Sequence, residues 1–403
     1  MARGELFEAV AGKGASLRRE LVVFAPLRTT LRFLTQPIKT VPVESWPARV
    51  GGRRKSARSA VWYGVAAFIL LTVGMAAAAD TVFSQWRDPE FALRVDQIRK
   101  WKAKAPHRPL VVVFGSSRTQ MGIVPGVMNF PDRPGSPLLY NFGYRGAHPL
   151  AAHLQFTRLL DSGITPAAVL IQLAPPELMI SDPAELQMPP VWRPRFSLGD
   201  IRRLEPHTTD FESFYNTWWE AHIRPWTTYK YGFLSDCGPF WQTNPQRLDF
   251  TWEFMDEYGF APCVEPNIGE QERARRHEEL RQMHEDTFTA FAPTERTQAI
   301  HREWVGRCKQ SGIAVAFYWA PESPSCMAFY TPEAREKIDT YSKGLAEEFG
   351  VPVFPAPTHL EAEDFVDEYH LRCSGAERYS RWLGKNYLKP WLAKVFPREG
   401  SRQ

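Results

Sequence analysis

The chain has 403 residues, 44% hydrophobic and 23% charged, without repeats or low-complexity tracts; this excludes a fibrous or disordered protein and allows one large α/β domain with insertions or two to three domains. The net charge of +4 is unevenly spread, because residues 1–59 hold 12 of the 49 Lys and Arg but only 4 of the 45 Asp and Glu. The rest of the chain has 37 basic and 41 acidic residues, so we do not expect the main domain to bind nucleic acid.

An uncharged apolar segment runs from Val61 to Ala79. As a helix, its 19 residues would span about 28 Å, close to the hydrocarbon thickness of a bilayer. Asp80 follows it, and four basic residues precede it: Arg53, Arg54, Lys55 and Arg58. The positive-inside rule therefore predicts a signal anchor over residues 60–80, a cytoplasmic basic tail over 1–59, and an exported periplasmic or extracellular domain over 81–403. A signal peptide cleaved after the small residues Ala76–Ala79 and a buried core helix are the alternatives.

The tail contains a segment, Leu17–Leu34, that mixes four arginines with Leu, Val and Phe. One interpretation is a basic amphipathic segment lying along the anionic inner leaflet. The other is a disordered tail whose charges only orient the anchor.

After a predicted polar helix over residues 88–105, apolar β-branched runs alternate with helical segments. The expected strands are Leu110–Phe114, Leu138–Phe142, Ala167–Leu173, Ile313–Tyr318 and Val351–Phe354. The expected helices are Pro149–Leu160, Pro332–Phe349 and Ser374–Phe396. Wholly apolar strands that alternate with helices are typical of a parallel sheet covered on both faces, in which ligands bind at the carboxyl ends of the strands.

A long insertion, about residues 177–311, separates the third and fourth strands. Its first half reads as loop-like and is rich in aromatic residues: Phe214, Tyr215, Trp218, Trp219, Trp226, Trp241 and Trp252. Its second half predicts two charged helices, Glu270–Thr287 and Glu295–Ser311. The aromatic residues are expected to pack a subdomain, with stacking against sugar rings as the alternative.

The five cysteines stand in no Cys-X-X-Cys or Cys-X-X-His pattern, so we expect no zinc site. In an oxidising exported compartment, Cys237 and Cys263 are the pair we expect to form a disulfide, since they flank one loop-rich segment. The exported part also lacks an Asn-X-Ser/Thr sequon, which favours a bacterial envelope over a eukaryotic lumen.

The first strand runs into Gly115-Ser116-Ser117-Arg118, which places a serine at the ligand-binding edge of the sheet. A serine nucleophile needs a base that is oriented by a third group. Near the other end of the chain, Asp367 lies three residues before His370, at a spacing that lets the carboxylate accept from the imidazole and fix its tautomer. The pair follows the last strand and precedes the C-terminal helix.

These blocks resemble those of the SGNH/GDSL esterases and acyltransferases. The resemblance implies a flavodoxin-like three-layer sandwich with a parallel five-stranded sheet. Gly115-Ser116-Ser117 is similar to the Gly-Asp-Ser block, with Ser117 as nucleophile, His370 as base, Asp367 as its orienting group, and Ser116 as a departure from the family Asp. Asn141-Phe-Gly143-Tyr-Arg-Gly146 is similar to the second block, in which Gly146 would donate to the oxyanion hole beside the Ser117 N–H. Gly115, Ser116 and Asn141 would support these groups from behind.

The third block departs from the family. Where the resemblance implies Gly-X-Asn-Asp, this chain has Ala174-Pro175-Pro176-Glu177. Pro176 has no N–H and no side-chain donor, so one oxyanion contact is missing or is supplied elsewhere, and we assign Arg118 as the substitute. Loss of one such donor costs roughly a hundred-fold or more in rate. Glu177 is interpreted either as the group that orients Arg118 or as a carboxylate in solvent.

The resemblance covers roughly residues 108–176 and 312–390. Within the family, the chain is similar to membrane-anchored bacterial members with Gly-Ser-Ser in the first block. These are the D-alanyl transfer protein of teichoic acid modification and the SGNH-like partners of membrane-bound O-acyltransferases. The alginate-acetylation relatives have Asp and His before Ser, unlike this chain. The resemblance implies that no organic cofactor and no metal are needed. It also implies a membrane-bound O-acyltransferase as the partner that delivers the acyl group.

The sequence therefore predicts an extracytoplasmic serine acyltransferase or esterase that acts on an envelope glycan or polymer, by transfer or by hydrolysis. The alternative is a catalytically silent envelope protein that binds a glycan or a membrane partner. His148 and His153, near the second block, are interpreted as cleft residues or as ordinary surface or core histidines.

Overall fold

The computed structural model describes residues 50–180, 195–209, 211–238, 254–263 and 269–397. By its internal contacts the chain divides into two units, residues 1–65 and 66–403. The predicted tail segment Leu17–Leu34 lies outside the described residues, as do Trp241 and Trp252.

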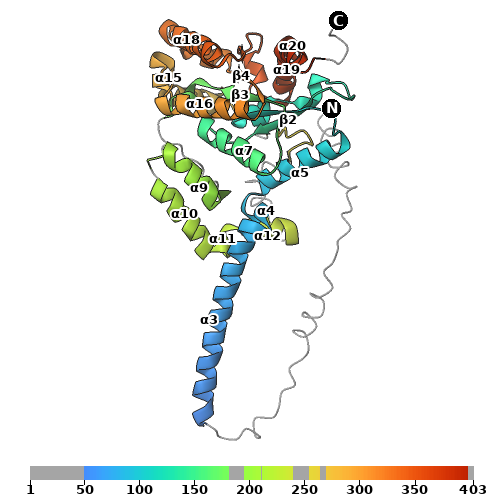
Figure 1. Ribbon diagram of the computed structural model, residues 1–403. Helices are drawn as coiled ribbons and strands as arrows, with labels where there is room; N and C mark the ends of the chain where they lie inside the picture. The colour runs from blue at the N-terminus through green and yellow to red at the C-terminus, as the bar shows by residue number, and fades with distance from the viewer. Residues whose placement is uncertain (1–49, 181–194, 210, 239–253, 264–268, 398–403) are drawn as a thin grey trace, which may run out of the picture. The chain divides into compact units, whose positions relative to one another are not determined.

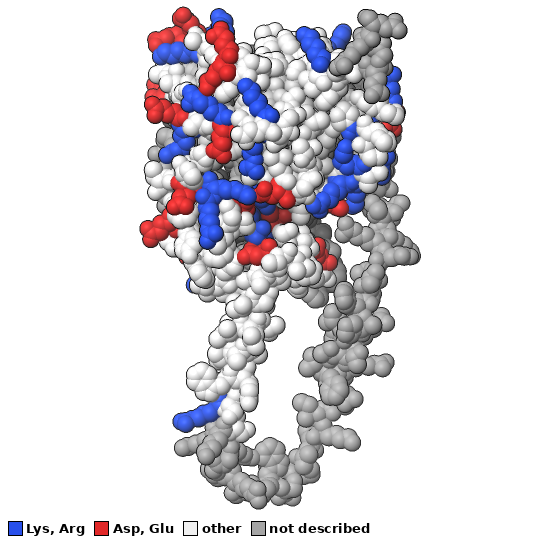
Figure 2. Space-filling model, viewed as in Figure 1, with Lys and Arg blue, Asp and Glu red and all other residues white. Residues whose placement is uncertain are grey.

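Helix α3 (Val50–Thr81) contains the predicted apolar segment. Its part Ser56–Thr81 is long and apolar enough to cross a membrane, with a mean hydropathy of 1.9, and it is the one such helix among the described residues. Large apolar side chains from Val61 to Val73 are exposed along it. In Figure 2 the visible surface of α3 is white, except for blue near its N-terminal end. These properties fit the expected anchor and leave the alternative of a buried core helix unsupported.

Two helices follow α3, namely α4 (Ser84–Arg87) and α5 (Pro89–Lys104). Asp88 caps α5 by accepting a hydrogen bond from the Phe91 N–H, and Pro89 occupies the first turn, where its missing N–H costs nothing. The polar helix predicted over residues 88–105 is confirmed.

The core is a five-stranded, all-parallel sheet in the order β2-β1-β3-β4-β5 (Figure 1). The strands are β1 (Leu110–Gly115), β2 (Leu138–Gly143), β3 (Ala168–Leu173), β4 (Ala314–Trp319) and β5 (Val353–Phe354). All five predicted strands form, with ends shifted by one or two residues. β1 lies between β2 and β3, with Gly115 opposite Gly143 and Phe114 opposite Ile171.

Helices cover both faces of the sheet, because successive side chains of each strand point to opposite sides. Val112 and Phe114 pack in one apolar cluster with α7 (Pro149–Asp161), α16 (Glu295–Gln310) and α18 (Pro332–Phe349). Val111 and Val113 pack in the other with α19 (Cys373–Leu383), η8 (Gly384–Leu388) and α20 (Lys389–Val395). The C-terminal helix was predicted to be continuous over 374–396, but it widens to a π-helix at η8. Pro390, which lacks an N–H, comes just after this irregular turn.

The insertion between β3 and β4 is mostly helical where it is described. It contains α8 (Pro175–Leu178), α9 (Leu198–Leu204), η4 (Glu205–His207), α10 (Phe211–Ile223), α11 (Pro225–Thr228), α12 (Lys230–Cys237), α14 (Glu270–Met283) and α15 (Glu285–Ala290). The prediction of a loop-like first half is therefore wrong at α9, α10, α11 and α12. The predicted helix Glu270–Thr287 is broken at His284, which leaves the helical region of backbone angles.

The remaining short elements are η2 (Pro125–Met128), α17 (Pro324–Phe329) and η7 (Ala362–Asp364). No disulfide joins Cys237 to Cys263, so the expected pair is wrong. Cys308 and Cys326 are buried in the apolar cluster with α7 and α16, where they pack as small apolar side chains.

Candidate active site

Ser117 stands at the carboxyl end of β1, as the first residue of α6 (Ser117–Gly122). Ser116 caps this helix, its side chain accepting from the Arg118 N–H, which fixes the direction in which the chain leaves the strand. Ser117 is half-buried, whereas the residues on either side of it are buried.

Three predicted residues are brought together although two of them lie 253 positions apart. The Ser117 Oγ is 2.8 Å from His370 Nε2, and His370 Nδ1 is 2.8 Å from Asp367 Oδ2. The other carboxylate oxygen, Oδ1, accepts from the backbone N–H groups of Tyr369 and His370 at 2.8 and 2.7 Å. Because the carboxylate accepts from Nδ1–H, the imidazole presents its Nε2 lone pair to the serine hydroxyl.

Asp367 is held in its ionised form. Burial alone would raise its pKa, but the hydrogen bond and charge of His370 and the two backbone N–H groups lower the pKa to about 2. A permanent carboxylate behind His370 favours the imidazolium that forms when the ring takes a proton.

The loop that carries Asp367 and His370 is closed on itself. An antiparallel bridge pairs Phe365 with Leu371, and the Val366 N–H donates to the His370 carbonyl at 2.8 Å. Phe365 and Leu371 are buried in the cluster with α19, so both ends of the loop are anchored in the core. This fixes the imidazole at the sheet edge before any substrate binds.

Asn141 ties α6 to the end of β2. Its side-chain amide is fully buried and donates to the carbonyls of Thr119 and Ile123 at 2.8 and 2.7 Å, with a third, longer contact of 3.3 Å to Gln120. Its oxygen accepts from the Gly143 N–H at 2.8 Å. The supporting role expected of Asn141 thus has a structural basis in its hold on the helix that begins with Ser117.

A second buried network lies behind the serine, and the sequence did not predict it. Gln172 Oε1 accepts from the Ser116 N–H at 3.2 Å and the Thr119 hydroxyl at 2.5 Å, and that hydroxyl also contacts the Tyr318 hydroxyl at 2.5 Å. The Gln172 side-chain Nε2 donates to the Glu177 carboxylate at 2.8 Å. The one available signal was a glutamine inside the otherwise apolar strand Ala-Val-Leu-Ile-Gln-Leu, at its ligand-binding end.

Gly115 lies directly over this network and needs to be glycine. A β-carbon there would stand 2.6 Å from the Gln172 side chain and would also collide with Thr119. Two of the predicted supporting residues, Gly115 and Ser116, therefore pack against buried polar groups that hold the β1–α6 turn in place.

Arg118 is buried and pairs with Glu322, at 2.9 Å between Nη1 and Oε1. Its guanidinium also lies over the Tyr369 ring, 4.0 Å from the centroid. Burial alone would lower the pKa of Arg118, but the charge of Glu322 outweighs it and the pKa is raised. Glu177 was expected either to orient Arg118 or to lie in solvent. Glu177 is half-buried and Gln172 donates to it, so the interpretation as a carboxylate in solvent is wrong. Burial raises the pKa of Glu177, and the nearby charge of Arg118 opposes that rise.

Gly146 lies in an exposed turn between β2 and α7, with φ of 73°, a left-handed conformation that favours glycine. In the position of the third block, Pro175 and Pro176 are buried in the first turn of α8. The next two N–H groups, of Glu177 and Leu178, donate to the Ala174 carbonyl, so this turn supplies no spare backbone donor.

His148 and His153 are buried, and burial lowers the pKa of each to about 3. His153 packs against Phe156 and Trp304 within the apolar core, so it is a neutral core residue rather than a cleft residue. Within the described residues, no three His, Cys, Asp or Glu side chains gather as metal ligands would.

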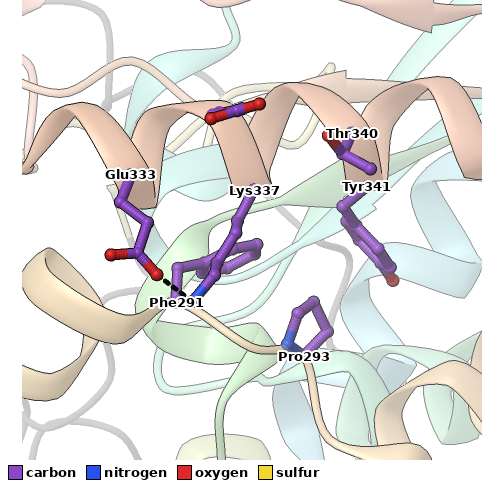
Figure 3. Close-up of a pocket in the computed structure, with 7 residues that line it drawn as sticks. Phe291, Pro293, Glu333, Lys337, Thr340 and Tyr341 are labelled. Atoms are coloured by element: carbon purple, nitrogen blue, oxygen red, sulfur yellow. Dashed lines mark ion pairs between the residues drawn. The ribbon is translucent and has the colours of Figure 1, made fainter.

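Two cavities differ in their relation to this site. One, of about 240 Å³, lies between α14 and the loop Asp367–Tyr369, so it borders the orienting carboxylate. A larger one, of about 490 Å³, is lined by Phe291, Pro293 and the helix α18, where Lys337 pairs with Glu333 at 2.8 Å (Figure 3). The larger cavity shares no residue with the three hydrogen-bonded groups, whereas the lining of the smaller includes Asp367 but neither Ser117 nor His370.

A scan of the chain against protein-family models and a search of curated proteins both find no match.

Proposed function

We propose that this protein is a membrane-anchored serine acyltransferase or esterase that acts outside the cytoplasm on an envelope glycan or polymer. The observation that carries the proposal is the continuous hydrogen-bonded series Ser117–His370–Asp367, with both contacts at 2.8 Å. A hydroxyl, an imidazole and an ionised carboxylate in this order form the arrangement that activates serine in unrelated acyl-transfer enzymes.

The chemistry proceeds in two balanced steps. The Ser117 Oγ attacks the carbonyl carbon of an acyl donor, His370 takes the hydroxyl proton, and the proton passes to the departing oxygen as the donor's acyl–oxygen bond breaks. In the second step, His370 takes a proton from an acceptor hydroxyl or from water, and the new oxygen displaces Ser117 from the acyl group. Asp367 stays ionised throughout and stabilises the imidazolium.

The Ser117 N–H, at the first position of α6, and the Gly146 N–H are the proposed donors to the oxyanion. Arg118 remains our candidate for the missing third-block donor, although one of its N–H groups is committed to Glu322. A weakened oxyanion site slows attack on a poor ester by any acceptor, water or hydroxyl, so the proposal favours an activated acyl donor.

The SGNH-like fold belongs to this proposal as well. Parallel strands in the order 2-1-3-4-5 are the flavodoxin-like arrangement, in which ligands bind beyond the carboxyl ends of the strands. Ser117 follows β1 at that edge. The apolar helix α3 would hold this edge near a membrane partner that delivers the acyl group, with residues 1–59 in the cytoplasm.

Covalent labelling with a fluorophosphonate tests the proposal. The full-length chain, solubilised in mild detergent, is treated with the probe and the modified peptide is mapped. We expect modification of Ser117, lost in Ser117→Ala and His370→Ala and retained in Ser162→Ala, a control serine at the end of α7. A folded chain that stays unlabelled would overturn the catalytic proposal and favour the catalytically silent binding protein.

A further inference from the structure

Three helices of the insertion pack around the C-terminal end of α3. We call α10, α11 and α12, residues 211–237, the collar (Figure 1). Ala221 and Tyr229 of the collar form a buried apolar cluster with Ala79, against which Met75 of α3 also packs. The last turns of the apolar helix are therefore covered on one side by protein.

Polar contacts clamp this packing just where the apolar segment ends. Asp80 accepts from Arg87 at 2.6 Å, and its other carboxylate oxygen lies 2.8 Å from His222 Nε2 in the collar. The Trp86 indole N–H donates to Asp236 at 3.0 Å. Gly232 of α12 leaves no room for a β-carbon against the Trp86 backbone. The collar is thus joined closely to the end of α3.

The collar nevertheless exposes large apolar side chains beside the apolar helix. Trp219 is 46% exposed, Ile223 63% and Trp226 38%. The Trp226 ring stacks on the ring of Phe68, with centroids 6.0 Å apart. Phe68 lies twelve residues before Asp80, which is about 18 Å along a helix axis. The tip of the collar therefore reaches back along α3, past the polar clamp at Asp80.

Membrane dimensions place this tip in lipid. A hydrocarbon core of about 30 Å takes about 20 helical residues, so a span that begins after Arg58 ends near Ala78. The clamp at Asp80 and His222 then lies at the hydrocarbon boundary. Phe68, about 15 Å inside Ala78, and the Trp226 ring stacked on it lie near the middle of the span. A soluble surface seldom exposes two tryptophans and an isoleucine together, so this patch suits contact with lipid.

We propose that the collar inserts into the outer leaflet of the bilayer, with Trp219, Ile223 and Trp226 among the lipids. The occupant is lipid rather than a partner protein, because the exposed patch is continuous with the lipid-facing surface of α3. Lys230 is exposed at the start of α12, next to Tyr229, which packs against Ala79 at the end of the span, and it suits a lipid phosphate. This inference rests on the anchoring part of the proposed function and is independent of the chemistry at Ser117.

Such a collar gives the exported domain a second attachment. A single helix leaves a domain free to tilt about its exit point, whereas a span clamped to a collar that also enters the lipid restricts that tilt. The β3–β4 insertion that contains the collar also contains α14, which borders the cavity beside Asp367. Restricting the tilt would keep the carboxyl edge of the sheet at a set height above the membrane.

Site-specific photocrosslinking tests the inference. The full chain, in vesicles of zwitterionic and anionic phospholipid, carries p-benzoylphenylalanine at position 226, 223 or, as a matched control, 327; Met327 is 39% exposed on α17, outside the collar. We expect lipid adducts at 226 and 223 several-fold above those at 327. Equal adducts at all three positions, or none at 226 in a chain that resists extraction by alkaline carbonate, would overturn the inference.

Two further results separate the possible failures. Repeating the crosslinking in native membranes and finding protein adducts at 226 in place of lipid would show a partner protein on the collar and refute a lipid occupant. A chain that carbonate extracts would refute both the anchor and the collar. Fluorophosphonate labelling of the same variants reads the chemistry at Ser117 separately, because positions 223 and 226 do not contact the site.

Discussion

Asn141→Ala removes the side chain that ties the serine-bearing helix to the sheet. Asn141 is fully buried, and three of its hydrogen bonds are 2.7–2.8 Å long: two donated to the carbonyls of Thr119 and Ile123, and one accepted from the Gly143 N–H. At about 1 kcal/mol each, their loss lowers the free energy of unfolding by roughly 3 kcal/mol. Because α6 begins with Ser117, labelling of that serine should slow as well.

Asn141→Asp separates the contributions of donor and acceptor. It keeps the acceptor for Gly143 but removes both donors and points a carboxylate at two carbonyl oxygens, so it should cost at least as much as Asn141→Ala. Urea unfolding of the detergent-solubilised chain, followed by near-ultraviolet circular dichroism, measures both variants. Asn216→Ala, at an exposed position on α10, is the control and should change stability by less than about 0.5 kcal/mol. A loss below about 1 kcal/mol in Asn141→Ala would refute the structural role assigned to this residue.

Three further predictions concern the groups around Ser117. Gly115→Ala should strongly destabilise the chain and abolish labelling of Ser117, whereas Gly306→Ala, in open space on α16, should stabilise the chain by about 1 kcal/mol. Comparable free energies of unfolding for the two variants would contradict the packing at the β1–α6 turn. Because folding lowers the pKa of Asp367 from 3.8 to about 2, its carboxylate should contribute about 2 kcal/mol to the free energy of unfolding above pH 5, and this contribution should be lost as the pH falls from 4 to 2. If the difference in stability between the wild type and Asp367→Asn does not change over this range, the prediction is wrong. Glu322→Gln removes the carboxylate that pairs with buried Arg118 and should lower the free energy of unfolding by roughly 3–5 kcal/mol. The double variant Arg118→Met with Glu322→Leu should restore much of this stability. A Glu322→Gln variant as stable as the wild type would count against the buried pair.

The strands and the meeting of Ser117 with His370 could be predicted because they follow from local patterns and topology. Each strand is a wholly apolar run, and residues that follow parallel strands meet at one edge of the sheet. An Asp three residues before a His can reach its ring within one short loop. These inferences need no knowledge of which distant side chains touch.

The polar network behind the serine could not be predicted, because it depends on contacts between side chains that are distant in the sequence. Gln172 contacts Thr119 on another element, and Arg118 pairs with Glu322, 204 positions away. Glu177 and Glu322 each follow a strand end, and strand ends alone do not decide which carboxylate pairs with Arg118. Side-chain partners across strands depend on the register and depth of the sheet.

The collar was mistaken for a loop because its aromatic residues obscure a helical period. In α10, Tyr215, Trp218, Trp219 and Ile223 are apolar yet remain partly or largely exposed, so the pattern of apolar residues does not mark a buried face. A surface that meets lipid breaks the rule by which helices in water are recognised.

The most direct test of an acyl-serine route is to look for the intermediate. The full-length chain is mixed with an activated acetyl ester, quenched in acid, and examined by intact-mass and peptide mass spectrometry. We predict an acetyl group on Ser117 that accumulates in the wild type, is absent in Ser117→Ala and forms far more slowly in His370→Ala. An ester turned over without any modified serine, or acetylation that does not depend on His370, would contradict the mechanism.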